Sequence, residues 1–346
     1  PPFNQQDDYD LRVSAVSPSS QRLLTQLGVW PIVCHQRVCD YQQMRVWHEH
    51  GDAEMHFACE QIGSRYLGTI VENRRLQTAL LQQLSALANA SLFPGLEVTA
   101  IEQQDHMVQV STGDQQMFEA ELLLAADGRD SSAARMLDVP ALGGEYRQTA
   151  IVANVSTELA HQFTAWQRFL ATGPLAFLPL SNGQSSIVWS ADQPLAEELI
   201  ALPDDEFRQR LAQAFEFRLG AVTASSRRAA FGLRWHSVQR WLNGRVLLIG
   251  DAAHGVHPLA GQGVNLGFAD VALLDRLLSA GESLYQPRLL RRFERQRKAE
   301  TVTATLLFSA LKQVYAQTNP WFCLARDMGM TLVEKNRMIK RLVMQS

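Results

Sequence analysis

One stretch, residues 245–270, constrains the fold of this chain more than any other. It reads RVLLIGDAAHGVHPLAGQGVNLGFAD. Its apolar run 246–249 is bounded by turn-forming residues, which is typical of a strand buried on both faces in a parallel sheet. After a loop interrupted by proline and glycine, apolar residues return at helical spacing from Val264 to about Leu278. This order of strand, loop and helix indicates an α/β fold with a ligand site at the strand ends.

The loop at the centre of this stretch predicts an electron-rich or anionic ligand. A helix that begins just after residues 261–263 leaves its first backbone N–H groups without helical partners. The positive end of its dipole then points into the loop. An ordinary strand-to-loop corner is the alternative interpretation, but it does not explain so many small and polar residues at fixed offsets.

The pattern GDAAHxxxPxxGQGxNxGxxD in residues 250–270 resembles the second flavin motif of the single-component aromatic-ring hydroxylases, which use FAD and NAD(P)H. The text HPLAGQGVNLGF is similar to the ubiquinone-biosynthesis branch of that family. The resemblance implies that Asp251 reaches the ribityl or pyrophosphate part of FAD, that Pro258 lies beside the flavin ring, and that the backbone of residues 261–264 faces its pyrimidine end. The cofactor-binding residues implied in this stretch are Gly250, Asp251, Pro258, Gly261, Gln262, Gly263, Val264 and Asn265.

Two further segments resemble the same family. Residues 12–17 read RVSAVS, where the resemblance implies that Arg12 approaches the flavin and its phosphates. A surface arginine is the alternative. Residues 71–77 read VENRRLQ and lead into a helix, and the resemblance makes Asn73 and Gln77 candidates for flavin contacts. A polar helix N-terminus exposed to water is the alternative there.

A second buried strand is predicted over residues 122–125, directly before Asp127 and Gly128. This text resembles the DG motif of the family, which is assigned to the FAD pyrophosphate and to passage of NAD(P)H. Carboxylates at the ends of two buried strands, Asp127 and Asp251, suit ribose and ribityl hydroxyls because they accept hydrogen bonds. We therefore expect both carboxylates to serve one flavin.

The N-terminal text departs from the family pattern. It begins with PPFNQQDDYD, which we interpret as a loop. In the family, an earlier βαβ unit carries GxGxxG and an acidic residue for the ribose. The 346 residues contain neither. We expect a strand followed by GxGxxG ahead of Pro1.

Composition bounds the remaining possibilities. A chain of 346 residues, 46% hydrophobic, is long enough for one large or two moderate domains. A formal net charge of −3 gives no electrostatic reason to expect nucleic acid as a partner. The four cysteines lack zinc-site spacing, so we expect reduced thiols in a cytosolic protein and no metal. No apolar run is long enough to span a bilayer, so membrane contact is expected only at the surface.

The middle of the chain predicts a substrate domain. Residues 44–59 alternate around Gly51-Asp52 as in a hairpin, and strands 175–180 and 186–190 flank an Asn-Gly turn that requires positive φ angles. An amphipathic helix is predicted over residues 207–219. The large side chains interpreted as core rather than as a substrate box are Leu175, Phe177, Trp189 and Trp166.

The predicted architecture is a Rossmann-like FAD-binding domain, incomplete at its N-terminus, with a mixed or antiparallel substrate domain and a helical C-terminus. The boundaries are residues 1–40, 68–145 and 242–285 for the FAD domain, 41–67 and 146–241 for the substrate domain, and 286–346 for the C-terminal helices. Residues 321–344 mix basic and apolar side chains, which suits an anionic membrane surface or a partner, with packing against the first domain as the alternative.

The resemblance implies a flavin-dependent monooxygenase of ubiquinone biosynthesis. NAD(P)H reduces FAD, O2 adds at the flavin C4a carbon, and the hydroperoxide passes OH to the ring of a polyprenylated phenol or benzoquinol. The segments TAWQRF, GPLAFLPL and VENRRLQ lean toward hydroxylases of methoxy-methyl-benzoquinols, with other ring positions as close competitors. His254 and Pro258 are the catalytic candidates, His254 through a proton; a histidine that caps the loop is the alternative.

Two other functions remain open at this stage: a hydroxylase of a small soluble aromatic compound, and a flavin-free scaffold subunit of a biosynthetic complex. The expected partners are a lipophilic aromatic or quinol substrate, O2, other ubiquinone-biosynthesis proteins and the membrane surface, with no nucleic acid. The expected location is cytoplasmic, peripheral on the inner face of the cytoplasmic membrane.

Overall fold

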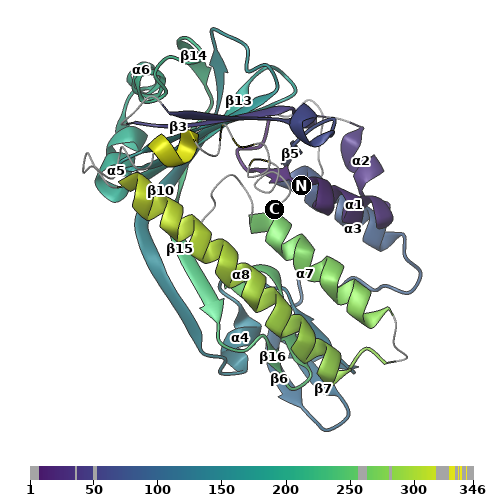
Figure 1. The fold of residues 1–346 in the computed structure, drawn as a ribbon. Coiled ribbons are helices and arrows are strands. Elements are labelled where there is room, and N and C mark those ends of the chain that lie inside the picture. The colour runs from purple at the N-terminus through teal and green to yellow at the C-terminus, as the bar shows by residue number, and fades with distance from the viewer. Residues whose placement is uncertain are drawn as a thin grey trace.

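The computed structural model describes residues 8–35, 37–49, 53–255, 263–279, 283–316, 327–331, 334, 336 and 340. These residues form one large mixed sheet, three small sheets and the helices that cover them (Figure 1). The α/β class predicted from the sequence is confirmed.

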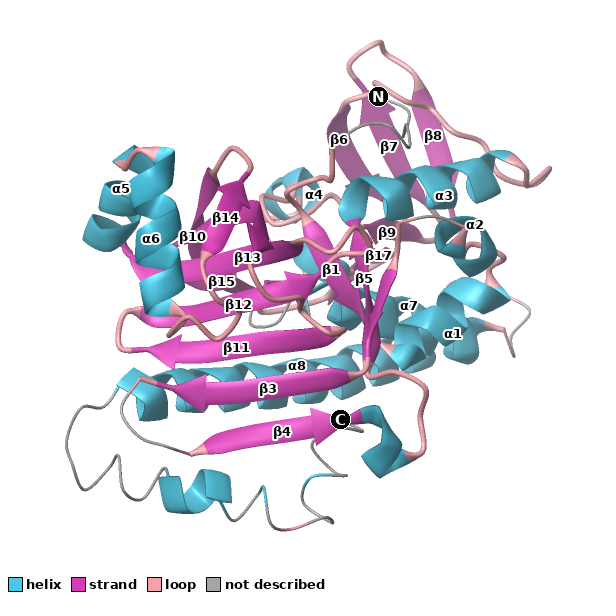
Figure 2. Ribbon diagram, turned by 90° about the horizontal axis from the view of Figure 1, so that it is seen from above, coloured by secondary structure: helices cyan, strands magenta, loops and turns pink. Residues whose placement is uncertain are grey.

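The large sheet is mostly antiparallel, and Figure 2 shows several of its strands side by side. Its strands are, in order, β18 (His254–Gly255), β15 (Ala229–Val238), β10 (Ala141–Thr157), β13 (Ser185–Asp192), β12 (Gly173–Pro179), β11 (Thr164–Leu170), β3 (Gln43–His48) and β4 (Glu54–Ala58), with β14 (Val222–Ser225) beside β10. The antiparallel pairing of β3 with β4 confirms the predicted hairpin. β11 pairs with β3 in parallel.

Three small sheets lie beside the large one. They are β1 (Val13–Val16), β5 (Gly68–Glu72) and β2 (Cys39–Tyr41); β16 (Leu242–Asn243), β17 (Val246–Leu248) and β9 (Leu123–Ala125); and β6 (Val98–Gln103), β7 (Val108–Thr112) and β8 (Met117–Ala120). β17 lies in a parallel pair, as predicted for residues 246–249, and its partner is β9. All three residues of β17 are fully buried, but Leu124 of β9 is 42% exposed. The prediction of a buried strand is therefore wrong for Leu124, since no described element covers its face.

The helices pack against these sheets. They are α1 (Pro18–Gln26), α2 (Trp30–Cys34), α3 (Asn73–Ser85), α4 (Ser132–Met136), α5 (Gln193–Ala201), α6 (Asp204–Ala214), α7 (Gly263–Leu278) and α8 (Pro287–Ala316), with 3-10 turns η1 (Cys59–Ile62) and η2 (Gly250–Ala252). α7 confirms the helix expected from about Val264. α8 is the long diagonal helix of Figure 1 and contacts α7, β16 and β11. None of the described helices combines the length and apolar character that crossing a membrane requires.

The largest apolar cluster lies between the large sheet and helices α5 and α6. Leu175, Phe177 and Trp189 are buried in it, and the partly buried Trp166 packs against it. The interpretation of these four side chains as core is confirmed. Phe177 stacks on Phe215 with ring centroids 3.9 Å apart, which brings the end of α6 against the sheet.

The hairpin between β12 and β13 forms as predicted, but by a different turn. Of its two central residues only Gly183 has a positive φ, +86°. The loop spans three residues, 181–183, because Leu180 N–H donates to Gln184 O at 2.8 Å. The expectation of positive φ at Asn182 is therefore wrong: in a longer loop a glycine alone supplies the left-handed residue.

Helix α6 ends at Ala214, five residues before the predicted end. Glu216 and Phe217 have φ values of +54° and +51°, which no helix tolerates. The buried Arg168 holds this turn, because its guanidinium donates to Ala214 O at 2.5 Å and to Glu216 Oε1 at 2.6 Å. The apolar periodicity of the sequence continues to Leu219, but a tertiary contact from β11 ends the helix at Ala214.

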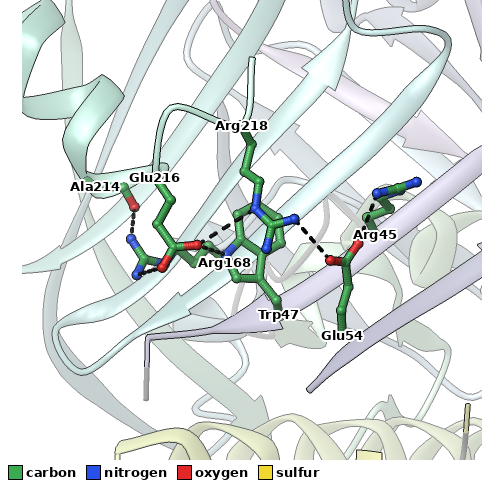
Figure 3. A network of polar contacts seen from close by, with 7 residues as sticks. All are labelled: Arg45, Trp47, Glu54, Arg168, Ala214, Glu216 and Arg218. Atoms are coloured by element: carbon green, nitrogen blue, oxygen red, sulfur yellow. Dashed lines mark hydrogen bonds and ion pairs between the residues drawn. The ribbon is translucent and has the colours of Figure 1, made fainter. Parts of the chain in front are cut away.

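A network of polar contacts extends from this turn to β3 and β4 (Figure 3). Trp47 Nε1 donates to Glu216 Oε2 at 3.0 Å. Arg218 donates to Glu54 at 3.1 Å, and Arg45 pairs with the same carboxylate at 3.3 Å. The network ties the turn after α6 to the edge of the large sheet.

Arg168→Met is expected to lower the free energy of unfolding by about 2–3 kcal/mol. Methionine keeps the apolar stem but removes the donor of the Ala214 carbonyl and leaves the Glu216 carboxylate with only Trp47 and the more distant Arg218. Urea denaturation measures the change. Arg210→Met is the control, since Arg210 is half exposed and lies 3.7 Å from Glu198; we expect under ~0.5 kcal/mol there. Equal losses in the two variants would contradict this account.

Candidate functional site

The carboxylates of Asp127 and Asp251 come from one edge of the β16-β17-β9 sheet. Leu248 lies opposite Ala125 in the parallel register, and Ile249 N–H donates to Ala125 O at 3.0 Å. Asp127 follows Ala125 by two residues, and Asp251 follows Leu248 by three. The structure therefore brings the ends of the two strands together, as a shared ligand requires.

The two carboxylates differ in what they already bind. Asp127 accepts hydrogen bonds from Ser131 Oγ at 2.6 Å, Ser132 Oγ at 3.1 Å and Ala133 N–H at 3.0 Å, at the start of α4. Partial burial acts to raise the pKa of Asp127, but these hydrogen bonds outweigh it and the pKa is lowered. Asp251 is exposed, and its carboxylate has no hydrogen-bond partner among the described residues. Asp251 is thus the more open acceptor.

Glycines beside both carboxylates leave the backbone accessible. Gly128 has φ +85° and Gly250 has φ +57°, in the left-handed region that favours glycine. A Cβ added to either would meet no described atom within 4 Å. A ligand can therefore approach the main chain at these two positions.

A buried ionic cluster fixes the Gly250–Asp251 corner. Asp270 of α7 is fully buried and accepts hydrogen bonds from Gly250 N–H at 2.8 Å, His254 Nε2 at 2.8 Å and Arg297 Nε at 2.6 Å. Burial acts to raise the pKa of Asp270, but hydrogen bonds and charge from His254 and Arg297 outweigh it and the pKa is lowered. The corner that presents Asp251 is thus attached to both α7 and α8.

His254 lies inside this cluster. It is 3% exposed, and its ring stacks on Trp241 with centroids 4.8 Å apart. Because Nε2 of His254 is hydrogen-bonded to Asp270 and the ring is buried, the geometry fits a structural role. The role of His254 in catalytic proton transfer stays a prediction. The other catalytic candidate, Pro258, lies outside the described residues, as do the cofactor-binding candidates Gly261 and Gln262.

The start of α7 lies against the β1–α1 corner. Val264 packs on an apolar cluster built by β1, β5, α1 and α3. Asn265 Oδ1 accepts from Ser17 N–H at 3.0 Å and Ser20 Oγ at 2.8 Å, while its Nδ2 donates to Ala15 O at 2.7 Å. The Asn265 amide is thus largely occupied by the protein itself, which supports a joining role. Its role as a direct cofactor ligand stays a prediction.

Asn265→Ala is expected to lower the free energy of unfolding by about 2–3 kcal/mol, because it removes three hydrogen bonds between α7 and the β1–α1 corner. Urea unfolding of the FAD-free protein measures this without a contribution from ligand affinity. Gln26→Ala, at an exposed position of α1, is the control, and we expect a change within ~0.5 kcal/mol. A loss in Asn265→Ala no larger than the control's would exclude the joining role.

Arg12, Asn73 and Gln77 form a separate group at the other end of β1. Arg12 is exposed and its backbone carbonyl accepts from Asn73 N–H at 3.0 Å. Asn73 Oδ1 accepts from Ser14 Oγ at 2.7 Å, and Gln77 is exposed one turn further along α3. Arg12 precedes Ala15, the residue that Asn265 contacts, by three residues. At about 3.3 Å per residue of a strand the separation is about 10 Å, which an extended cofactor can span.

Sequence reasoning missed Asp270 and Arg297 as part of this site, and also Glu72. Asp270 was visible as the last position of the GxNxGxxD pattern. Glu72 is 1% exposed at the end of β5, where it accepts from Asp10 N–H at 2.7 Å and from Arg37 at 3.2 Å. Burial raises the pKa of Glu72. A carboxylate directly after the apolar residues of a strand was the signal for it.

These features fit a dinucleotide cofactor such as FAD. The open carboxylate of Asp251 suits hydroxyl groups, and the exposed guanidinium of Arg12 suits a phosphate. The glycine backbones leave room for close approach, and α7 begins beside them. The family model described as "FAD binding domain" matches residues 5–306.

The chain belongs to this FAD-binding family. FAD is therefore its cofactor, as the sequence predicts. Curated relatives of this FAD-binding chain include the ubiquinone hydroxylase UbiL of Rhodospirillum rubrum, 34% identical, with 97% of this chain and 79% of the relative covered. The 3-demethoxyubiquinol 3-hydroxylase of Escherichia coli is 31% identical, with 98% and 88% covered.

Solved structures of the same fold include the p-nitrophenol 4-monooxygenase PnpA from Pseudomonas putida DLL-E4. It shares 16% identity with a TM-score of 0.76, over 98% of this chain and 88% of that one. Klebsiella pneumoniae HpxO, complexed with FAD and uric acid, shares 19% identity with a TM-score of 0.73, over 94% and 85%. These likenesses show the fold of the FAD-binding chain.

Proposed function

We propose that this chain is a flavin-dependent monooxygenase that hydroxylates the ring of a polyprenylated phenol or benzoquinol in ubiquinone biosynthesis, with NAD(P)H and O2 as co-substrates. One observation carries the proposal: relatives named as ubiquinone-pathway hydroxylases match nearly the whole chain, at 34% and 31% identity. The ends of β9 and β17 support it, because they present carboxylates to a common cofactor.

FAD, when bound, supplies the redox and oxygen chemistry, while the protein binds, orients and shields. In our proposal Asp251 accepts hydrogen bonds from cofactor hydroxyls, and Arg12 offsets phosphate charge. Asp127 organises the start of α4 beside them, and Asp270 holds the Gly250 corner in place. Each of these roles uses a group described above and requires no metal.

One face of the large sheet is suited to a flat ring. The β10–β13 register sets Ala150 opposite Ser190, on the face away from the cluster that contains Ile151 and Trp189. Ala176 of β12 shares that face, because it pairs with Val188. In our proposal the substrate ring lies against this face. The three small side chains are at most 8% exposed, so water is excluded there, which protects reactive intermediates in oxygen chemistry.

Two assays test the function. The purified protein is expected to be yellow and to contain FAD, and its gene is expected to restore ubiquinone in a strain that lacks the native hydroxylase. The quinone intermediate that accumulates in that strain identifies the ring position. Colourless protein that fails to bind FAD would support the scaffold alternative. Turnover of small aromatic acids, but not of prenylated rings, would support the soluble-substrate alternative.

We also propose a cytoplasmic location, peripheral on the inner face of the cytoplasmic membrane. A polyprenylated substrate resides in the bilayer, so the enzyme must meet it there. The basic segment 321–344 predicted for this contact lies mostly outside the described residues. Its described residues Met330 and Lys340 pack against the large sheet instead, since Met330 is buried beside Phe57 and Lys340 donates to His56 O at 2.5 Å.

A further inference from the structure

Helix α8 has two opposite faces. One face is buried against the rest of the protein through Leu290, Phe293, Arg297 and Thr301. Because successive residues of an α-helix are rotated by about 100°, the residues that point away from the buried side form one continuous strip along the helix. We call this line the α8 stripe; it consists of Arg288, Arg291, Arg292, Arg295, Ala299, Val302 and Leu306.

The first two turns of the α8 stripe carry four exposed arginines. None of the four has a hydrogen bond or ion pair among the described residues. The cations just beside the stripe behave differently, since Arg297 binds Asp270 and Lys298 binds Glu294. The described acidic residues of α8 are Glu294 and Glu300, and both pair with those two cations. The positive charge of the stripe is therefore uncompensated.

The next turns of the stripe are apolar and exposed. Val302 is 52% exposed and Leu306 is 64% exposed, one turn further along. Ala299 links them to the arginines. Exposed aliphatic side chains in line with unpaired cations are a costly arrangement in water, and they favour a partner that is both anionic and apolar.

We infer that the α8 stripe is a docking surface for an anionic phospholipid bilayer. Guanidinium groups bind phosphate headgroups, and aliphatic side chains enter the boundary with the acyl chains. A second copy of the chain fits poorly. A twofold contact centred on the arginines brings like charges together, and one centred on Ala299 sets guanidinium groups against Val302 and Leu306 without a counter-ion. The inference rests on the proposed function for the reason to visit a membrane, where a polyprenylated substrate lies.

Vesicle flotation with the FAD-loaded protein tests the inference. Wild type is expected to bind vesicles of phosphatidylglycerol and phosphatidylethanolamine at low salt, to bind less as salt screens the arginines, and to bind phosphatidylcholine vesicles weakly. Each cation near an anionic surface contributes about 5-fold to affinity. The variant with Gln at Arg288, Arg291, Arg292 and Arg295 is therefore expected to lose at least ~20-fold if two of them reach the headgroups, and about 600-fold if all four do.

A matched control separates the stripe from net charge. It changes four other exposed arginines to Gln, namely Arg22, Arg65, Arg210 and Arg227. The vesicle affinity of this control variant is expected to stay within ~3-fold of wild type, because the four arginines that it changes lie away from the stripe. The V302S/L306S double variant keeps every charge and is expected to lose about 10-fold, with the loss persisting at high salt. Flavin absorbance and far-UV circular dichroism check that each variant is folded.

Three outcomes would overturn the inference: no binding of wild type to anionic vesicles, equal loss in the stripe and control variants, or a change of oligomeric state in the stripe variant with vesicle binding intact. None of these outcomes depends on catalysis. Hydroxylation of the prenylated substrate in detergent is measured separately, so failure of the docking surface is distinguishable from failure of the proposed function.

Discussion

Asp270→Asn is expected to lower the free energy of unfolding by about 3–5 kcal/mol, the usual cost of leaving a buried charge unpaired. The Asp270 carboxylate is fully buried and is the acceptor for Gly250 N–H, His254 and Arg297. Asparagine keeps the shape but removes the buried counter-ion of Arg297, which is left with only the half-exposed carboxylate of Glu300. Urea denaturation followed by tryptophan fluorescence measures the loss, with Trp241 as a reporter beside His254.

Glu300→Gln is the matched control for this effect. The Glu300 carboxylate is the other acidic group bound to Arg297. Its side chain is 49% exposed on α8. We expect a loss below ~1 kcal/mol there, because water screens an exposed pair. Equal losses of unfolding free energy in the two variants would show that the burial of Asp270 does not determine the size of the effect.

The same carboxylate predicts a pH dependence. The pKa of Asp270 is lowered in the folded protein from its ordinary value of 3.8. A carboxyl group with a lower pKa when folded stabilises the protein fully above its unfolded value. That contribution disappears as the pH falls below 3.8 and through the folded value. Wild type is therefore expected to lose more stability than Asp270→Asn on acidification in this range.

Asp251→Ala is expected to weaken FAD binding by about 10- to 100-fold while leaving the free energy of unfolding of the FAD-free protein unchanged. The carboxylate is exposed and has no described partner, so the fold loses nothing with it. A hydrogen bond to a charged group contributes about 1.5–3 kcal/mol, which is the source of the expected range. Flavin fluorescence titration measures the dissociation constant.

Glu97→Ala serves as the control, because Glu97 is an exposed carboxylate in the segment before β6. It makes the same change of net charge and is expected to leave FAD affinity unchanged. An unaltered dissociation constant in Asp251→Ala would remove this residue from the cofactor site. A large loss of stability instead would give it a structural role.

Local pattern was sufficient to predict the elements that carry the site. The run 246–249 and the helical spacing from Val264 identified β17 and α7, because burial and periodicity leave direct traces in the sequence. That Asp127 and Asp251 serve one cofactor was implied by the resemblance to the hydroxylase family. The parallel pairing of β9 with β17, which brings the two strand ends together, was found only in the structure.

Contacts between distant residues explain what the sequence did not show. Asn265 binds Ala15, 250 residues earlier, and no local pattern records which amide finds which carbonyl. The end of α6 depends on Arg168 of β11, and the burial of His254 depends on Asp270 and Trp241. The exposure of Leu124 likewise depends on what covers β9.

Helix α7 acts as a spacer between the two halves of the site. Asn265 contacts the β1–α1 corner, and five residues later Asp270 contacts the Gly250 corner. Inserting one residue between them would rotate one contact by about 100° and move it by about 1.5 Å relative to the other. No single placement of the helix then keeps both contacts. The length of this interval therefore fixes how far apart the two corners stand, and insertions there are expected to be far less tolerated than substitutions.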